Sequence, residues 1–342
     1  MTDLVTGGAG FIGHHLVKTL LEQNRPVRVF DLAQKPETVG PADWHQGSVT
    51  DPAAVRRAMT GVARVFHIAG LGDLWRLDTE DYQAVNVEGT KLIAEEAMRA
   101  RVDCFVHTST SALLAGAKSG GRGEVAVAGA YTRSKCEAEA HLRRAHRRGL
   151  RVVTLRPSAV IGPGPGRMTA PMRMLDDIIS GCLPAYLDAP LSFVDVRDLA
   201  EAYLAAADRG QKGEAYVIGH EQVRLSAILS IIASHDVTVP RRRLPYSLAW
   251  PTAVTAELMS RYITHKPPVA SIEGVRLAGR PMSLANRPDH RSLGLSLRPL
   301  EQTIGQTVDW LRERRGSRSA KAPAAPSPAG VGRPDHWARP KP

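Results

Sequence analysis

The fold is decided by a stretch near the start of the chain, Leu4-Val-Thr-Gly-Gly-Ala-Gly-Phe-Ile-Gly13. Its first three residues predict a short buried strand, and residues 10–23 predict a helix with an apolar stripe along one side. The glycines between them fit both Gly-x-x-Gly-x-x-Gly (7, 10, 13) and Gly-x-Gly-x-x-Gly (8, 10, 13). In such a turn Gly7 bends the chain off the strand, Gly10 leaves room for a pyrophosphate, and Gly13 permits close packing. The pattern predicts a dinucleotide site with its phosphates at the helix N-terminus.

A carboxylate at the end of the second predicted strand indicates which dinucleotide is bound. Residues 27–30 predict this strand, and Asp31 follows it, 18 residues beyond Gly13. An acid at about this distance holds the ribose hydroxyls of the adenosine half. No arginine directly follows Asp31, so its charge should repel the 2′-phosphate of NADP. The sequence therefore predicts NAD over NADP, with Arg28 and Lys35 as the two nearby cations that oppose this interpretation.

The composition is typical of a soluble globular enzyme. The chain has 342 residues, of which 43% are hydrophobic and 23% charged, enough for one large α/β domain with a smaller lobe. We see no secretory leader, no long apolar run and no ligand spacing among the three cysteines, so we expect a cytoplasmic protein with no membrane span and no metal site. The net charge of +11 predicts a basic, solvated surface and no nucleic-acid site, because no recognition motif for nucleic acid accompanies it.

Predicted strands and helices alternate through the first half of the chain, which indicates a doubly wound parallel sheet of the Rossmann type. We predict an NAD-binding core over residues 1–160 and a smaller, mostly helical substrate lobe over 161–315, from which residues 193–220 return to the core. Residues 116–129 read as a loop, and residues 316–342 as a disordered, basic tail rich in proline and alanine. The carboxyl ends of the strands should gather the functional residues at one edge of the sheet.

Tyr131 and Lys135 are the sharpest indication of catalysis. Residues four apart share one face of a helix, and a nearby ammonium lowers the pKa of a phenol from its usual value of about 10. Tyr131 can then exchange a proton with a substrate oxygen while the cofactor carries a hydride. A hydroxyl that follows the preceding strand would hold the same oxygen. We predict Thr110 for this role, with Ser111 as the rival.

With these motifs the chain resembles the extended short-chain dehydrogenase/reductase family, also called the NAD-dependent epimerase/dehydratase family. The resemblance covers about residues 1–220 and implies a bound NAD, a catalytic triad of Thr110, Tyr131 and Lys135, and a homodimer through the helices near 82–100 and 131–148. The motifs that carry it are Thr6–Gly13, Asp31, Asn86-Val-Glu-Gly-Thr90, Thr108-Ser-Thr110, Tyr131-x-x-x-Lys135, Leu155-Arg-Pro157, Gly162-Pro-Gly164 and Phe193–Leu199. The cofactor contacts that it implies are Gly7, Gly10, Phe11, Ile12, Gly13, Asp31, Ser48, Val49, Ala69, Asn86, Thr108, Lys135, Pro157 and Val160.

The resemblance also bears on the substrate. Members that act on nucleotide-diphosphate sugars usually carry an asparagine where this chain has Ser158 and Ala159. The C-terminal part is similar to the 3β-hydroxysteroid dehydrogenase-like branch, which implies an apolar substrate such as a sterol, a terpenoid or a long-chain β-hydroxy or β-keto acid. The uncharged run Leu244–Ala256, which contains Trp250, would line an apolar pocket, touch a membrane surface, or form ordinary core.

Three functions follow from these observations, in order of preference. The first is an NAD-dependent oxidoreductase that interconverts a secondary alcohol and a ketone on a mainly apolar small molecule. The second is an NAD-dependent nucleotide-sugar epimerase or dehydratase. The third is a dinucleotide-sensing protein without catalysis, which the intact pair of Tyr131 and Lys135 opposes, because a sensor needs no acid or base.

Overall fold

The computed structural model describes residues 2–37, 39–116, 128–280, 282 and 289–321, with side chains as far as Ser317. Most of the loop expected at residues 116–129 and most of the expected C-terminal tail lie outside these residues. In the described part of the chain, we find no helix with the length and apolar character that crossing a bilayer requires.

The centre of the molecule is a sheet of seven parallel strands. Its order is β3-β2-β1-β4-β5-β6-β11, which reverses direction between β1 and β4. Ligands of such sheets bind at the carboxyl ends of the strands beside this reversal. The predicted doubly wound Rossmann fold is confirmed, with these strand bounds: β1 (Thr2–Thr6), β2 (Val27–Asp31), β3 (Asp43–Gln46), β4 (Val62–His67), β5 (Cys104–Thr108), β6 (Val152–Pro157) and β11 (Ala215–Ile218).

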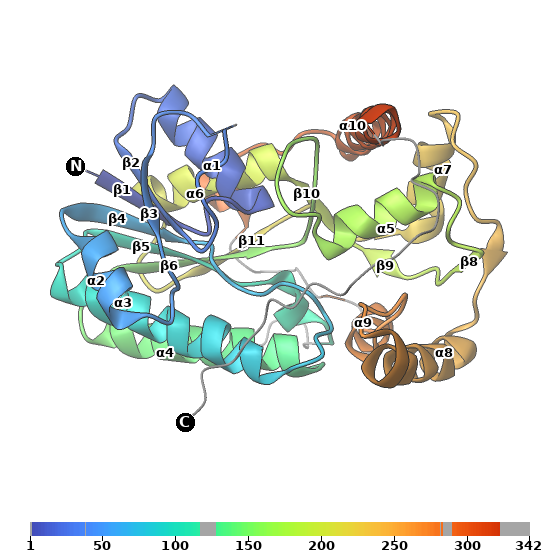
Figure 1. Cartoon of the computed structure of the whole chain (residues 1–342), viewed down its shortest axis with the longest axis horizontal. Helices are drawn as coiled ribbons and strands as arrows, with labels where there is room; N and C mark the ends of the chain where they lie inside the picture. Colours follow the sequence, from blue (N-terminus) through green and yellow to red (C-terminus); the bar gives the residue numbers. More distant parts are fainter. Residues whose placement is uncertain (1, 38, 117–127, 281, 283–288, 322–342) are drawn as a thin grey trace, which may run out of the picture.

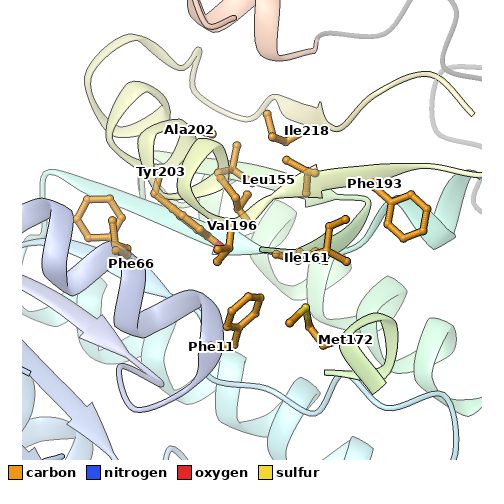
Figure 2. Close-up of a cluster of buried hydrophobic side chains, with 14 of the residues drawn as sticks. Phe11, Phe66, Leu155, Ile161, Met172, Phe193, Val196, Ala202, Tyr203 and Ile218 are labelled. Atoms are coloured by element: carbon orange, nitrogen blue, oxygen red, sulfur yellow. The ribbon is translucent and has the colours of Figure 1, made fainter. Parts of the chain in front are cut away.

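Helices cover both faces of the sheet. In Figure 1, α1 (Phe11–Glu22) and α6 (Val196–Arg209) lie above the sheet, and α2 (Pro52–Met59), α3 (Thr90–Arg99) and α4 (Ala130–Arg147) lie below it. Figure 2 shows the apolar core on the side of the sheet that α1 and α6 cover. Phe11 of α1 and Tyr203 of α6 both belong to this core. This packing fixes the start of α1 above the sheet edge.

The helix predicted over residues 82–100 consists of two parts. A π-helix, η1 (Tyr82–Gly89), leads directly into α3. A Cβ atom at Gly89 would stand only 2.8 Å from Cγ2 of Val49, so the wider turn brings this backbone close to its neighbour. π-turns within helices often occur at functional sites, and η1 carries Asn86.

A smaller lobe stands beside the carboxyl ends of the strands, to the right in Figure 1. Its four main helices surround three short strand pairs, β7–β10, β9–β12 and β8–β13. The helices are α5 (Ala170–Ile179), α7 (Leu225–Ala233), α8 (Tyr246–Met259), which continues as the π-helix η3 (Ser260–Thr264), and α9 (Ile272–Ala278). The strands are β7 (Ala159–Ile161), β8 (Ala185–Tyr186), β9 (Pro190–Leu191), β10 (Phe193–Asp195), β12 (Val223–Arg224) and β13 (Arg242–Arg243). Short 3₁₀ turns are η2 (Ser111–Leu114) and η4 (His290–Leu293).

The boundary of the C-terminal tail differs from the prediction. The last helix, α10 (Leu300–Lys321), runs past Gly316, where disorder was expected to begin. Its apolar side packs into the main core, and Arg315 donates to Asp176 of α5 with 2.6 Å between Nε and Oδ1. This anchor holds the helix in place beyond the last buried residue. Arg318, Ala320 and Lys321, which follow it, favour a helix more than glycine or proline do.

Candidate active site

The glycine turn has the geometry of a phosphate cradle. Gly7 has a φ of +76°, and a Cβ atom there would lie 2.8 Å from Cα of Ala69. A Cβ atom at Gly13 would lie 2.1 Å from the carbonyl oxygen of Gly7. The N-cap residue of α1 is Gly10, which offers no side-chain cap, and the first turn contains no acidic residue. The first N–H groups of α1 are therefore available to an anion, which fits the pyrophosphate of a dinucleotide.

Phe11 and Ile12 stand in the first turn of α1. The ring of Phe11 is buried in the core shown in Figure 2, so only the backbone of Phe11 can face a cofactor. Gly166 passes close above this turn, since a Cβ atom there would lie 2.9 Å from the nitrogen of Phe11. The smaller lobe thus contributes backbone beside the first turn of α1.

The carboxylate of Asp31 is fixed at the end of β2. Its Oδ2 accepts a hydrogen bond from the nitrogen of Ala9, and its Oδ1 accepts one from the nitrogen of Ala33, each at 2.9 Å. Both nearby cations are engaged elsewhere. Arg28 donates to Asp43 at 2.7 Å and Lys35 donates to the carbonyl oxygen of Ala42 at 3.1 Å. With these bonds intact, neither cation is positioned to hold a 2′-phosphate beside Asp31.

We expect Asp31→Ser to weaken NAD binding and to strengthen NADP binding. Losing charge-assisted hydrogen bonds to the ribose costs about 1.5 kcal/mol, or roughly tenfold in Kd, and the repulsion of the 2′-phosphate disappears. Calorimetric titration of both cofactors measures each change. Glu37→Ser is the matched control, because it removes one exposed negative charge from the loop after Asp31 and leaves the bonds of Arg28 and Lys35 in place. An unchanged NAD to NADP ratio in Asp31→Ser would contradict the assigned role.

The other cofactor contacts that the resemblance implies lie along the same edge of the sheet. Ser48 and Val49 follow β3, where the hydroxyl of Ser48 bonds that of Thr50 at 2.7 Å. Ala69 follows β4 and donates its N–H to the carbonyl oxygen of Thr6 at 3.0 Å. Pro157 ends β6, whereas Val160 lies on β7, outside the seven-stranded sheet, with its side chain buried.

Lys135 of α4, Asn86 of η1 and Thr108 at the end of β5 form one polar cluster. The ammonium of Lys135 donates to the carbonyl oxygen of Thr108 at 3.0 Å. The amide of Asn86 accepts from Leu71 N at 2.7 Å and donates to the hydroxyl of Ser134 at 2.9 Å. A Cβ atom on Gly70 would lie 3.2 Å from Nζ of Lys135, so glycine keeps this surface open. Burial lowers the pKa of Lys135 to about 8, against the raising effect of nearby Glu139.

Tyr131 lies within reach of Thr110, but its pKa differs from the expectation. Burial raises the pKa of Tyr131 to about 12, although a hydrogen bond with Thr110 lowers it. The sequence predicted a lowered value because an ammonium stands one helical turn away. That prediction is wrong for this structure, since the ammonium of Lys135 is directed at a backbone carbonyl and the buried phenol lacks solvation for a negative charge.

Sequence reasoning missed Glu139, which lies behind the cluster on α4. Its carboxylate accepts two hydrogen bonds from Arg156, at 2.8 and 2.6 Å, and one from the hydroxyl of Ser109 at 2.6 Å. Burial alone would raise the pKa of Glu139, but the bonds from Arg156 reverse this and hold it below its usual range. The spacing offered a clue, because Glu139 stands four residues after Lys135 and so shares its helix face.

Glu273 is a second residue that was missed, and it comes from the other lobe. Its Oε2 accepts from the nitrogen of Tyr131 at 3.1 Å and its Oε1 accepts from the nitrogen of Thr132 at 2.8 Å. The carboxylate thus caps the first turn of α4 from α9, and burial raises its pKa. No local pattern could have revealed this contact, because 142 residues separate Glu273 from Tyr131.

We expect Glu273→Ala to lower kcat about tenfold, because losing this cap costs about 1 kcal/mol and frees the turn that carries Tyr131. Glu273→Gln should retain most activity, since its amide oxygen can still accept from one N–H group. The matched control is Glu257→Ala, which removes a carboxylate bonded to Ile272 N at the start of α9, at 2.6 Å. Steady-state kinetics on the three variants test this. Equal losses in Glu273→Ala and Glu257→Ala would show that α9 matters only for folding.

Comparison with known proteins identifies the family. The model of the NAD dependent epimerase/dehydratase family matches residues 4–219. The chain belongs to this family, and it is an NAD-dependent enzyme of the extended short-chain dehydrogenase/reductase type. The resemblance inferred from the motifs is confirmed.

Several curated proteins are similar over most of this chain. A protein of Synechocystis sp. with the provisional name dihydroflavonol 4-reductase is 30% identical over 323 residues, which are 90% of this chain and 94% of the relative. Sterol demethylase protein B of Methylococcus capsulatus is 29% identical over 329 residues, 92% of this chain and 99% of the relative. The 3-beta-hydroxysteroid dehydrogenase of Mycolicibacterium neoaurum is 30% identical over 237 residues, 63% of this chain and 64% of the relative.

Solved structures share the architecture. The crystal structure of gox2253 has a TM-score of 0.77 and 27% identity, and the match covers 92% of this chain and 98% of that one. UDP-glucose 4-epimerase of Thermus thermophilus, solved with NAD, has a TM-score of 0.69 and 23% identity, with 91% and 99% covered. The second likeness concerns the fold alone.

Proposed function

We propose that this enzyme interconverts a secondary alcohol and a ketone on a mainly apolar substrate, with Tyr131 as the acid and base. The observation that carries this proposal is the meeting of Tyr131 and Thr110, from different elements, beside the Lys135 and Asn86 cluster at the sheet edge. A phenol and a second hydroxyl can hold one substrate oxygen together.

The residues divide the reaction between them. The bound NAD supplies the hydride exchange. In oxidation, Oη of Tyr131 in its deprotonated form would accept the hydroxyl proton of the alcohol, and in reduction the protonated phenol would donate that proton to the ketone oxygen. Thr110 holds the reacting oxygen, and Lys135 holds the nicotinamide ribose. With a pKa near 12 the phenol of Tyr131 is protonated at neutral pH, which favours its action as an acid on a ketone.

Two kinds of observation support an apolar substrate over a nucleotide sugar. Sterol demethylase protein B and 3-beta-hydroxysteroid dehydrogenase are named for sterol and steroid chemistry. In addition, the polar side chains of the segment in which nucleotide-sugar members usually carry an asparagine are bonded within the protein. Ser158 donates to the carbonyl oxygen of Ile218 at 3.2 Å, and the guanidinium of Arg156 is held by Glu139.

A panel assay separates the proposed function from its main alternative. The enzyme is supplied with NAD and with steroid alcohols, terpenoid alcohols or UDP-glucose, and NADH is followed by absorbance. We expect NADH to form with one of the apolar alcohols. Turnover of UDP-glucose by enzyme that retains NAD through purification, with no external NAD required, would instead establish the epimerase.

The homodimer through η1, α3 and α4 stays a prediction, which light scattering tests.

Exchanging single hydroxyls decides between Thr110 and Ser111. We expect Thr110→Val to lower kcat about a hundredfold, because a positioned hydrogen bond to the reacting oxygen is lost. Ser111→Ala, on the adjacent residue of η2, should keep most activity. Steady-state kinetics with the best substrate of the panel measure both variants, and the reverse ranking would transfer the role to Ser111.

A further inference from the structure

We propose that the outer face of α8 and η3 docks the enzyme on the surface of an anionic lipid bilayer. We define this outer face by Leu248, Leu258, Met259, Tyr262 and Ile263, all of them exposed. Tyr262 is 72% exposed and Ile263 is 70% exposed. The sequence left open whether Leu244–Ala256 forms core, a pocket or a membrane contact. Within that run Ala249 and Ala253 are buried as core, whereas Leu248 is exposed and belongs to the outer face.

The helix α8 carries no charge over residues 246–256, which is unusual for a helix at the surface. Its inner side buries Ala249 and Ala253 against Val275 of α9. A surface helix ordinarily opposes such a stripe with charged residues. Here the run from Leu244 to Ala256 contains no charge at all, so the outward side meets water with leucine, threonine and proline. An exposed apolar face of this kind fits a partner that is itself apolar.

Positive charges stand at both ends of the outer face. Arg241, Arg242 and Arg243 precede it, and Arg261 and Lys266 lie at its far end, all of them exposed. Arg243 forms an ion pair with Asp188, at 3.0 Å between Nη2 and Oδ2. The one acid of the helix, Glu257, turns inward to accept a hydrogen bond from Ile272 N at 2.6 Å. Exposed apolar residues between basic residues are typical of helices that lie in the interface of anionic membranes.

This charge arrangement distinguishes a bilayer from a second copy of the chain. In a two-fold dimer built on α8, the same patch meets itself. An antiparallel pairing would place residues 241–243 of one copy near Arg261 and Lys266 of the other, and like charges would repel. Anionic lipid headgroups instead complement both ends at once. Trp250 is left out of the outer face because Arg276 covers its ring, with 5.2 Å from Cζ to the ring centroid.

The outer face also lies next to the candidate active site. The helix α9 packs on α8, and its residue Glu273 contacts the backbone of Tyr131. Figure 1 shows α8 and α9 side by side at the end of α4. A docked enzyme would therefore hold its reactive side near the lipid. Delivery of an apolar substrate from the bilayer rests on the proposed function, whereas the docking itself does not.

Vesicle co-sedimentation of the full chain tests the proposal. We compare phosphatidylcholine vesicles with vesicles of an equal mixture of phosphatidylcholine and phosphatidylglycerol. We expect binding to the mixed vesicles alone, weakened at high salt. Tyr262→Ser/Ile263→Ser should lower the bound fraction at least about tenfold. The matched control is Leu32→Ser, which removes an apolar side chain that is 69% exposed and follows β2 of the central sheet.

Charge reversal gives a second, independent variant. Arg241→Glu/Arg242→Glu should lower binding to the mixed vesicles about tenfold or more. Arg147→Glu/Arg148→Glu, an exposed pair at the C-terminal end of α4, should not. Circular dichroism checks that each variant folds. If Tyr262→Ser/Ile263→Ser does not fold, the charge-reversal variants alone test whether the outer face binds the vesicles.

Two results would overturn the proposal. One is a wild-type chain that binds neither kind of vesicle, or that binds as well after Tyr262→Ser/Ile263→Ser and after Arg241→Glu/Arg242→Glu as before. The other is a dimer, without vesicle binding, that Tyr262→Ser/Ile263→Ser converts to monomer in light scattering, which would assign the face to a second copy. The panel assay with soluble substrates is independent of either result, so a failure of docking is distinguishable from a failure of the proposed function.

Discussion

Tyr131→Phe should lower kcat by about a thousandfold, since a positioned acid or base contributes about 10²- to 10⁴-fold. The substitution removes one oxygen and leaves the ring in its buried position, so folding and NAD binding should change little. The loss falls on proton transfer to the substrate oxygen. Steady-state kinetics with the substrate found in the panel, together with calorimetric NAD titration, separate the two effects.

A neighbouring phenol provides the control for this variant. The ring of Tyr82 stands 6.2 Å from that of Tyr131, and its hydroxyl donates to the carbonyl oxygen of Asp73 at 2.5 Å. Tyr82→Phe should keep kcat within a few fold, because this hydroxyl is engaged with backbone. Near wild-type turnover in Tyr131→Phe would end the assignment of Tyr131, and equal losses in both variants would show that packing is at fault.

Arg156→Met should destabilise the fold by about 3–5 kcal/mol, because breaking a buried ion pair leaves its partner charged in a place that water does not reach. That partner is Glu139, whose side chain is 4% exposed, and Arg156 is itself only 10% exposed. Glu139→Leu/Arg156→Met should recover most of the loss, since both charges of the pair are then removed together. Lys18→Met, which breaks an exposed pair with Glu22 on α1, is the control and should cost below about 1 kcal/mol.

The stability deficit of Arg156→Met should depend on pH in a definite direction. In the native protein the pKa of Glu139 lies below its usual range. Its contribution to stability is therefore complete above the pKa of the unfolded chain, about 4.3, and is lost as the pH falls through the lower native value. In Arg156→Met the unpartnered carboxyl can take a proton, so the variant's deficit should shrink in acid. Urea unfolding at neutral and acidic pH measures this, and a deficit that is constant with pH would contradict it.

The sequence predicted where the glycine turn and Asp31 lie in the fold, because both are built from local turns. The glycines of residues 7–13 and the acid after β2 act through backbone geometry at a strand end, and the order of elements alone brings them together. Glu139 and Arg156 required knowledge of how β6 faces α4. Glu273 required the docking of α9, which depends on the whole second lobe. The pKa of Tyr131 depended on burial, which no spacing of residues reveals.

The contact between Glu273 and the first turn of α4 limits how the two lobes can be exchanged among relatives. A Cβ atom at position 129 would lie 2.4 Å from Oε2 of Glu273, so a side chain there would displace this carboxylate from the start of α4. A chimera that takes its C-terminal lobe from a protein without this acid would lose a support for the reacting phenol even if its new substrate fitted perfectly. Redesign of substrate range should therefore treat position 129 and position 273 as one unit.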